Sequence, residues 1–226
     1  MGPWPASPQD LIGRQGELGA AGPEPWEPGD ELLGGGCFLC FERGGPSGPG
    51  RAGEPGWAGA ALVRGGTLAA TAVVTGPAGW AYEAGLLALR EGPLLEAVVR
   101  ALPTPPDVLL VDSTGRDHPR RAGLALQLGA VLDVPSIGVT HRPLVAEGDW
   151  PADERGARSP LLLDGGLVGY WLRTRPGTRP LAVHAGWRTE PETAVAVVLA
   201  FADRARTPEP LRQARRVART ARARAR

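Results

Sequence analysis

The chain contains no lysine and no asparagine, and its 226 residues include only two cysteines and three histidines. Arginine therefore supplies all of the permanent positive charge on side chains, and the bias towards Ala, Gly, Pro and Arg is typical of a GC-rich coding sequence. Arginine abundance alone is thus no evidence for nucleic-acid binding. A zinc site built on two cysteine pairs is excluded, because it needs four ligands. Cys37 and Cys40 lie three apart on an expected strand and face opposite sides, so we expect two buried thiols.

Long apolar segments are also missing. No run of about 18 apolar residues occurs, which argues against a membrane-spanning helix. The first residues, Met-Gly-Pro-Trp-Pro, lack the basic and apolar regions of a secretory signal. We therefore expect a cytoplasmic protein. Hydrophobic residues make up 42% of the chain, which is enough for the core of one sizeable α/β domain.

Three segments differ in composition. Residues 1–28 are rich in Pro, Gly and acidic residues without periodicity, and they predict a flexible arm. Residues 29–206 alternate apolar runs with glycine and proline turns and predict one folded domain. Residues 207–226 form an arginine-rich tail, with seven arginines and no acidic residue after Pro210. Such a run indicates either a nucleic-acid contact or a solvated tail that reflects composition, and the sequence leaves both open.

Periodicity and turn residues predict an alternation of strands and helices in the central segment. Strands are expected at 32–41, 57–63, 68–74, 108–111, 136–140, 166–173 and 181–184, and helices at 83–90, 93–102, 121–132 and 191–206. The unit formed by residues 108–140 is strand, helix and strand, which implies parallel pairing. No internal repeat is visible.

The most informative stretch follows the buried run at 108–111. Asp112 ends this run and is followed by a glycine turn, the segment His118-Pro-Arg and a helix of small residues. A carboxylate at the end of a buried strand is a common ligand of Mg²⁺, which needs only one or two carboxylates besides water and phosphate. The alternative is that Asp112 only caps the turn, since such turns favour aspartate.

Several motifs together resemble the endonuclease V family, the nucleases that cut near deoxyinosine. They are WAYEAGLLALRE at 80–91, VLLVDSTGRDHPRRAGLALQLG at 108–129, PSIGVTH at 135–141, RTR at 173–175 and HAGWR at 184–188. The resemblance covers roughly residues 30–202. It implies an RNase H-like α/β fold, with a central mixed sheet flanked by helices.

The resemblance also implies a set of functional residues. Glu91 and Asp112 would be the catalytic carboxylates and would hold Mg²⁺ or Mn²⁺. Tyr82 resembles the family's wedge residue, which stacks into the duplex as the target base leaves it. The other residues implied in substrate binding are Gly85, Gly115, His118, Arg120 and Gly138.

Three positions depart from the family pattern. The family's first catalytic aspartate is matched by Phe38, or by Cys37 with a shift of one residue, and neither is an oxygen ligand for Mg²⁺. Glu42 lies about 13 Å further along the strand, so Asp30 and Glu31 are the first candidates for a substitute. His141 replaces the family's lysine, and Trp187 replaces its histidine. We expect Trp187 to fill the histidine's space and to block water activation, with His184 as a partial replacement.

Two functions are consistent with these residues. The first is metal-dependent cleavage of a phosphodiester bond near deoxyinosine or inosine, in DNA repair. The alternative is a catalytically impaired family member that binds nucleic acid without efficient cleavage, with the metal weakly bound. The sequence does not distinguish DNA from RNA as the partner. We expect no membrane partner and a monomer.

Overall fold

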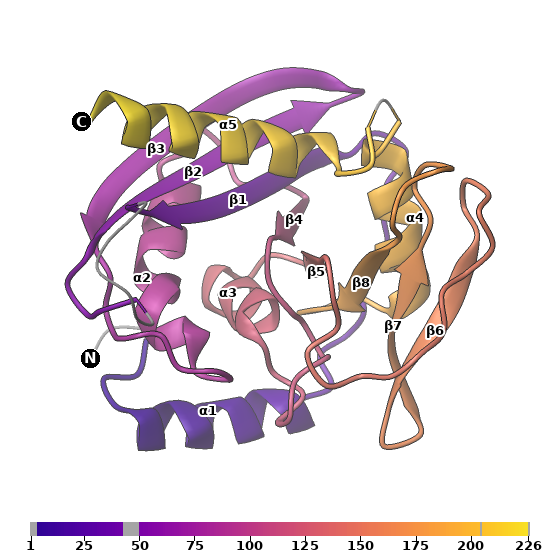
Figure 1. Ribbon diagram of the computed structural model, residues 1–226, viewed down its shortest axis with the longest axis horizontal. Helices are drawn as coiled ribbons and strands as arrows, with labels where there is room; N and C mark the ends of the chain where they lie inside the picture. The colour runs from indigo at the N-terminus through magenta and orange to yellow at the C-terminus, as the bar shows by residue number, and fades with distance from the viewer. Residues whose placement is uncertain (1–3, 43–49, 204, 226) are drawn as a thin grey trace.

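A computed structural model describes residues 4–42, 50–203 and 205–225, and its core is an eight-stranded mixed sheet with the order β3-β2-β1-β4-β5-β8-β7-β6 (Figure 1). The strands are β1 (Leu33–Phe41), β2 (Pro55–Arg64), β3 (Thr67–Pro77), β4 (Val108–Val111), β5 (Ser136–Thr140), β6 (Arg158–Leu163), β7 (Gly166–Leu172) and β8 (Leu181–Ala185). The helices are α1 (Pro8–Ala20), α2 (Leu87–Arg100), α3 (Leu124–Leu132), α4 (Pro191–Phe201) and α5 (Glu209–Arg224).

The helices cover both faces of the sheet. Side chains of α2 and α3 pack with Leu109 and Val111 of β4 on one face, and those of α4 and the start of α5 pack with Val108 and Leu110 on the other. This division follows from the alternation of side chains along a strand. Helix α1 lies outside α2 and α3, while α5 crosses β1, β2 and β3 on the opposite face (Figure 1). The predicted α/β class is therefore confirmed.

The parallel pairing predicted for residues 108–140 is present. Strand β4 lies between β1 and β5 and is parallel to both, with Cys37 beside Val111 and Gly138 beside Val111 on the other side. The carboxyl ends of these three strands consequently meet at one edge of the sheet. The turn that follows Asp112 begins at this edge.

The predicted helices at 83–90 and 93–102 form one helix. Pro93 lies inside α2 rather than at the first position of a second helix. Proline removes the hydrogen bond that the carbonyl of Leu89 would accept in a regular helix. An ideal Cβ on Gly79 would lie 2.3 Å from that carbonyl oxygen, so the chain before α2 packs directly against the irregular turn.

The predicted flexible arm at 1–28 contains a regular helix, α1, over Pro8–Ala20. Ser7 caps α1 by accepting a hydrogen bond from the backbone N–H of Asp10 (3.2 Å), and Leu11, Gln15 and Leu18 form its buried face. The spacing of four and three places these side chains on one side of the helix. The sequence missed this helix because glutamine occupies the middle of its buried stripe.

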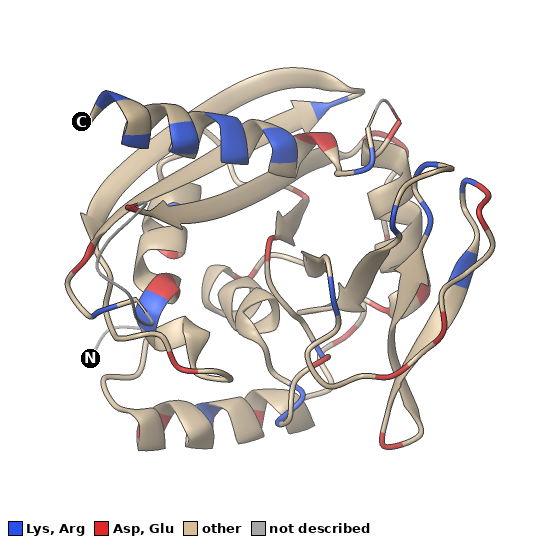
Figure 2. Ribbon diagram, viewed as in Figure 1, with Lys and Arg blue, Asp and Glu red and all other residues tan. Residues whose placement is uncertain are grey.

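Most of the predicted arginine-rich tail is helical as well, because α5 spans Glu209–Arg224. Leu211, Ala214 and Ala218 of α5 are buried against β1 and β2. Glycines make this close approach possible, because an ideal Cβ on Gly36 would lie 2.3 Å from the carbonyl carbon of Pro210, and one on Gly59 would lie 2.5 Å from the carbonyl oxygen of Ala214. The exposed side of α5 carries arginine at regular intervals (Figure 2).

Smaller differences concern the other end of the sheet. The sequence missed β6, which forms a hairpin with β7, and it extended α4 to residue 206, whereas this helix ends at Phe201. Among the described residues, no helix combines the length and the apolarity that a bilayer crossing needs.

Candidate functional site

A pocket of about 230 Å³ opens between the segment before α2 and the turn after β4. Four of the residues implied by the resemblance line it together, namely Tyr82, Gly85, Asp112 and His118. Its wall also includes Ser113 and Thr114 from the turn after β4, Thr140 at the end of β5, Leu144 from the following loop, and Leu87, Ala88 and Leu124 from the helices. Tyr82 is 52% exposed, so its ring stands at the mouth of the pocket rather than in the core.

The carbonyl oxygen of Gly85 holds in place the pocket segment before α2, which also carries Tyr82. It accepts hydrogen bonds from Nε2 of Gln15 (3.0 Å), Nε2 of His118 (3.1 Å) and Nη2 of Arg120 (3.2 Å). Gly85 itself has φ +78°, a left-handed conformation that glycine adopts without strain. Three donors from two other parts of the chain therefore fix the segment that carries Tyr82.

His118 is a neutral donor in this arrangement. Its Nδ1 accepts a hydrogen bond from the backbone N–H of Arg120 (3.2 Å), so the proton resides on Nε2, which faces the carbonyl of Gly85. Burial lowers the pKa of His118, and the charge of Arg120 acts in the same direction. His118 is thus positioned to hold the pocket wall, and Arg120 does the same through Oε1 of Gln15 (2.6 Å).

Gly115 and Gly138 lie behind the pocket rather than in its lining. An ideal Cβ on Gly138 would lie 2.5 Å from the carbonyl oxygen of Ser113, and one on Gly115 would lie 2.1 Å from that of Ala185. Both glycines allow the turn after β4 to fold tightly over β5 and β8. Their role is backbone packing that shapes the pocket floor.

Glu91 in α2 and Asp112 after β4 are near enough to interact electrostatically. Burial raises the pKa of Glu91 to about 7, Arg90 opposes this shift, and repulsion from Asp112 adds to it. Asp112 is a pocket residue whose Oδ1 accepts a hydrogen bond from Nη2 of Arg215 in α5 (2.8 Å). Arg215 comes from the segment predicted to be a tail, so no sequence motif indicates this pair.

Cys37 and Phe38 face opposite sides at the position of the missing aspartate. Burial raises the pKa of the Cys37 thiol, and the nearby Asp112 and Glu91 add to this effect. Phe38 faces α5, where the guanidinium carbons of Arg215 and Arg219 lie 5.6 and 5.4 Å from the centre of its ring. On β1, the thiol of Cys37 therefore lies near Asp112 and Glu91, and the ring of Phe38 lies near Arg215 and Arg219.

The proposed substitutes for that aspartate are not at the site. Asp30 and Glu31 precede the first residue of β1, whereas Cys37 and Phe38 lie near its last residues. Glu31 approaches Arg64 at 3.9 Å, at the far end of the β1–β2 pair. The prediction that one of these two acids supplies the missing ligand is wrong.

The described residues offer fewer oxygen ligands for a Mg²⁺ or Mn²⁺ ion than the family pattern, because only Glu91 and Asp112 remain of its carboxylates. In residues 4–42, 50–203 and 205–225, no group of three or more His, Cys, Asp or Glu side chains is arranged to hold a metal ion. Mg²⁺ prefers oxygen ligands in octahedral geometry, but Phe38 offers none. Asp112 is already paired with a guanidinium.

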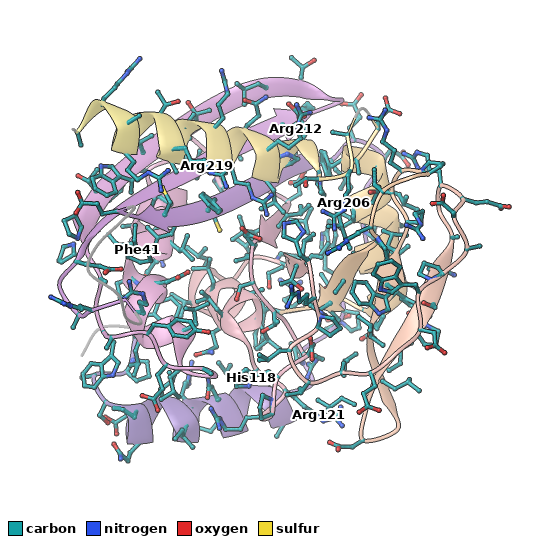
Figure 3. The ribbon with its side chains drawn as sticks, in the orientation of Figure 1. Phe41, His118, Arg121, Arg206, Arg212 and Arg219 are labelled. Carbon is teal, nitrogen blue, oxygen red and sulfur yellow. The ribbon has the colours of Figure 1, made fainter. Side chains whose placement is uncertain are left out.

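A second group of cationic side chains lies beside Asp112. Nη1 of Arg206 is 3.1 Å from Nδ1 of His141, the residue in place of the family's lysine. Burial and the charges of Arg206 and Arg215 lower the pKa of His141. Arg206 lies beneath the start of α5, and Arg219 lies further along that helix (Figure 3). This edge of the sheet is consequently positive on the α5 side.

Trp187 and His184 are both away from Asp112. Trp187 packs with Leu18, Ala122 and Leu126 and is not part of the pocket lining, so the prediction that it blocks water activation there finds no support in its position. Nε2 of the fully buried His184 lies 3.2 Å from Oδ2 of Asp117. His184 is therefore not a replacement for the histidine at Asp112.

Asp117 is the residue of this region that sequence reasoning missed. Its carboxylate accepts hydrogen bonds from the backbone N–H groups of Leu144 (2.5 Å), Val145 (2.9 Å) and Ala146 (2.7 Å). Burial alone would raise the pKa of Asp117, but the contact with His184 and these hydrogen bonds lower it to about 2. Asp117 thereby fixes the loop that brings Leu144 into the pocket wall.

Comparisons with known proteins identify the family to which the chain is similar. The family model described as Endonuclease V matches residues 52–216. The Endonuclease V of Roseiflexus sp. is 44% identical over 133 residues, which are 59% of this chain and 60% of that protein. The aligned part thus spans about 60% of the length of this relative.

Solved structures extend the likeness to nearly the whole chain. The Endonuclease V of Streptomyces avermitilis is 32% identical with a TM-score of 0.86, covering 98% of this chain and 96% of that one. The Endonuclease V of Ciona intestinalis, solved with a 24mer DNA containing an inosine followed by a ribo-adenosine, is 19% identical with a TM-score of 0.75 and covers 96% and 98%. These similarities confirm the predicted RNase H-like α/β fold.

Proposed function

Because the chain belongs to the endonuclease V family, we propose that it recognises deoxyinosine or inosine in nucleic acid, as a monomer. The observation that carries this proposal is the pocket in which Tyr82, Gly85, Asp112 and His118 meet. The likeness to the Ciona protein that was solved with inosine-containing DNA supports the class of ligand.

The pocket has the size and the surroundings that an extruded base needs. Its volume of about 230 Å³ lies below the roughly 300–1,000 Å³ of sites for drug-sized ligands, which suits a single base. Extrusion costs a few kcal/mol and least at a mispaired base. The exposed ring of Tyr82 is placed to stack where the base leaves, and the three hydrogen bonds to Gly85 keep its segment from moving away.

Cleavage is the second candidate activity, and the retained pair of Glu91 and Asp112 favours it. A raised pKa of about 7 for Glu91 is suited to proton transfer near neutral pH. The replacement of the third carboxylate by Phe38 and the pairing of Asp112 with Arg215 argue for recognition without efficient metal-dependent hydrolysis. We therefore place recognition first and hydrolysis second.

Binding and cleavage can be measured on the same set of oligonucleotides. Fluorescence anisotropy should show tighter binding to a strand with one inosine than to the same strand with adenosine, in DNA or in RNA. Substituting Tyr82→Ala should remove much of this preference, because stacking on an aromatic side chain contributes roughly 1–3 kcal/mol per base. Trp150→Ala is the matched control, since Trp150 is an exposed aromatic residue (56%) that does not line the pocket.

Incubation of the same strands with Mg²⁺, Mn²⁺ or EDTA tests hydrolysis. We expect little product in all three conditions. Fast, metal-dependent cleavage near inosine would make hydrolysis the main function. Equal affinity for the inosine and adenosine strands would contradict the proposed recognition.

A further inference from the structure

Arg215 is bound to Asp112, one of the two carboxylates to which a metal ion would bind at this site. Its Nη2 lies 2.8 Å from Oδ1 of Asp112, and the two side chains are only 17% and 24% exposed. Its guanidinium carbon lies 5.6 Å from the centre of the Phe38 ring. Cys37 pairs with Val111 across the two parallel strands, so Phe38 and Asp112 are the next residues along each strand. The guanidinium therefore contacts two adjacent positions at the end of β1 and β4.

The substitution at position 38 suits a guanidinium better than a metal ion. A planar guanidinium can lie against an aromatic face and donate to a carboxylate at the same time. A divalent ion requires oxygen atoms, which Phe38 does not have. Phe38, which replaces a carboxylate ligand of the family pattern, thus provides an aromatic surface for Arg215.

The position of Arg215 is set by a packed helix and not by a mobile side chain alone. Leu211 and Ala214 before it and Ala218 after it are fully buried against the sheet. The close contacts of α5 with Gly36 and Gly59 leave little room for the helix to shift. Arg219, one turn later, also faces Phe38 but has no hydrogen bond to Asp112 among the described contacts.

From this geometry we infer that Arg215 is a resident cation that takes the place of a divalent metal ion at Asp112. A Mg²⁺ ion would have to lie about 2.0–2.1 Å from a carboxylate oxygen, next to a positive charge that is already bound to the same group. The two cations repel each other and compete for the same carboxylate, so removing the charge of Arg215 should strengthen metal binding there. This inference concerns the protein alone and does not depend on which nucleic acid it recognises.

The test is a titration of the full-length protein with Mn²⁺, followed by the EPR signal of the free ion or by calorimetry. The wild type is compared with Arg215→Met, in which the stem remains for packing while the charge and the donors are lost. Arg219→Met is the matched control on the same helix and the same aromatic ring. We expect Arg215→Met to bind Mn²⁺ at least about tenfold more tightly than the wild type, and Arg219→Met to match the wild type.

A second pair of proteins keeps the test sensitive if the carboxylates of Glu91 and Asp112 bind Mn²⁺ too weakly to measure. Phe38→Asp adds a third carboxylate, and it is compared with Phe38→Asp combined with Arg215→Met. A gain of about tenfold or more in either pair, absent in Arg219→Met, supports the inference. Equal Mn²⁺ affinities within both pairs, including no binding by any of the proteins, would show that Arg215 is not the competing cation. Nucleic-acid affinities measured on the same proteins report separately on the proposed recognition.

Discussion

Asp117 offers the sharpest test of how the loop beside the pocket is held. Its side chain and that of His184 are both 0% exposed, and three consecutive backbone N–H groups donate to the carboxylate. Replacing Asp117→Asn removes the charge and forces the amide NH₂ towards backbone donors. Breaking one partner of a buried charged network typically costs about 3–5 kcal/mol, so we expect a loss of about 3 kcal/mol in the free energy of unfolding.

The pKa of Asp117 gives an independent estimate of the same interaction. Its value falls from 3.8 to about 2 on folding, and at about 1.4 kcal/mol per unit this corresponds to about 2 kcal/mol of stability. Because the folded pKa is depressed, this contribution is fully present above pH 3.8 and is lost as the pH falls through about 2. The asparagine variant does not titrate, so its stability deficit should shrink over that interval.

Urea denaturation at pH 7 and between pH 5 and 2.5 measures both effects. Asp164→Asn is the control, because Asp164 is 80% exposed and approaches Arg121 only at 3.4 Å, and such surface pairs contribute about 1 kcal/mol or less. A deficit for Asp117→Asn below about 1 kcal/mol at pH 7 would refute the argument, since it would equal that of the surface control. So would a deficit that stays constant as the pH is lowered.

Four further predictions concern α5, α1 and the pocket floor. Arg216→Gln combined with Arg224→Gln should reduce the slope of log K for duplex DNA binding against log salt concentration by about 2. Both side chains are exposed and can reach phosphates. An unchanged slope in a salt series would exclude these two arginines of α5 as phosphate contacts. Gln15→Ala should weaken inosine binding without changing affinity for the adenosine strand, because it releases the pocket segment, and anisotropy with both strands distinguishes this from a general loss of fold. Gly138→Ala should lower the melting temperature, since its Cβ would meet backbone at 2.5 Å. Gly13→Ala should raise it, because nothing lies within 4 Å of that Cβ, and the gain should be about 1 kcal/mol; a stable Gly138→Ala protein would contradict the packing argument.

The sequence predicted the centre of the sheet well because its signals are local. Strand β4 is a continuous apolar run ended by Asp112, and the unit from residue 108 to 140 carries its own turn residues. The pocket residues Tyr82, Gly85 and His118 were likewise identified from contiguous motifs. Helix α1 was missed because its buried stripe contains Gln15, whose hydrogen-bond partners Gly85 and Arg120 lie far away in the sequence.

Helix α5 was missed for a different physical reason. Two of its four buried residues are alanines, which carry little hydrophobic signal, and the helix packs closely only because Gly36 and Gly59 of the sheet let it approach. The hydrogen bond between Arg215 and Asp112 joins residues 103 positions apart. No periodicity or spacing in the sequence links the two, so only the three-dimensional arrangement could show that Asp112 and the basic segment meet.

The basic segment therefore has two sides with different roles. Arg215 and Arg222 turn towards the protein, where they donate to Asp112 and to the carbonyl of Phe41 (3.0 Å), while Arg216 and Arg224 are exposed. Truncation after Pro210 would remove both sides together with the buried Leu211, so loss of affinity after truncation would not identify a phosphate contact. Single charge substitutions on the exposed side do identify one.

The use of arginine and not lysine matters for the structure at Arg215. A lysine ammonium group could neutralise Asp112, but it lacks the planar guanidinium that lies near the ring of Phe38.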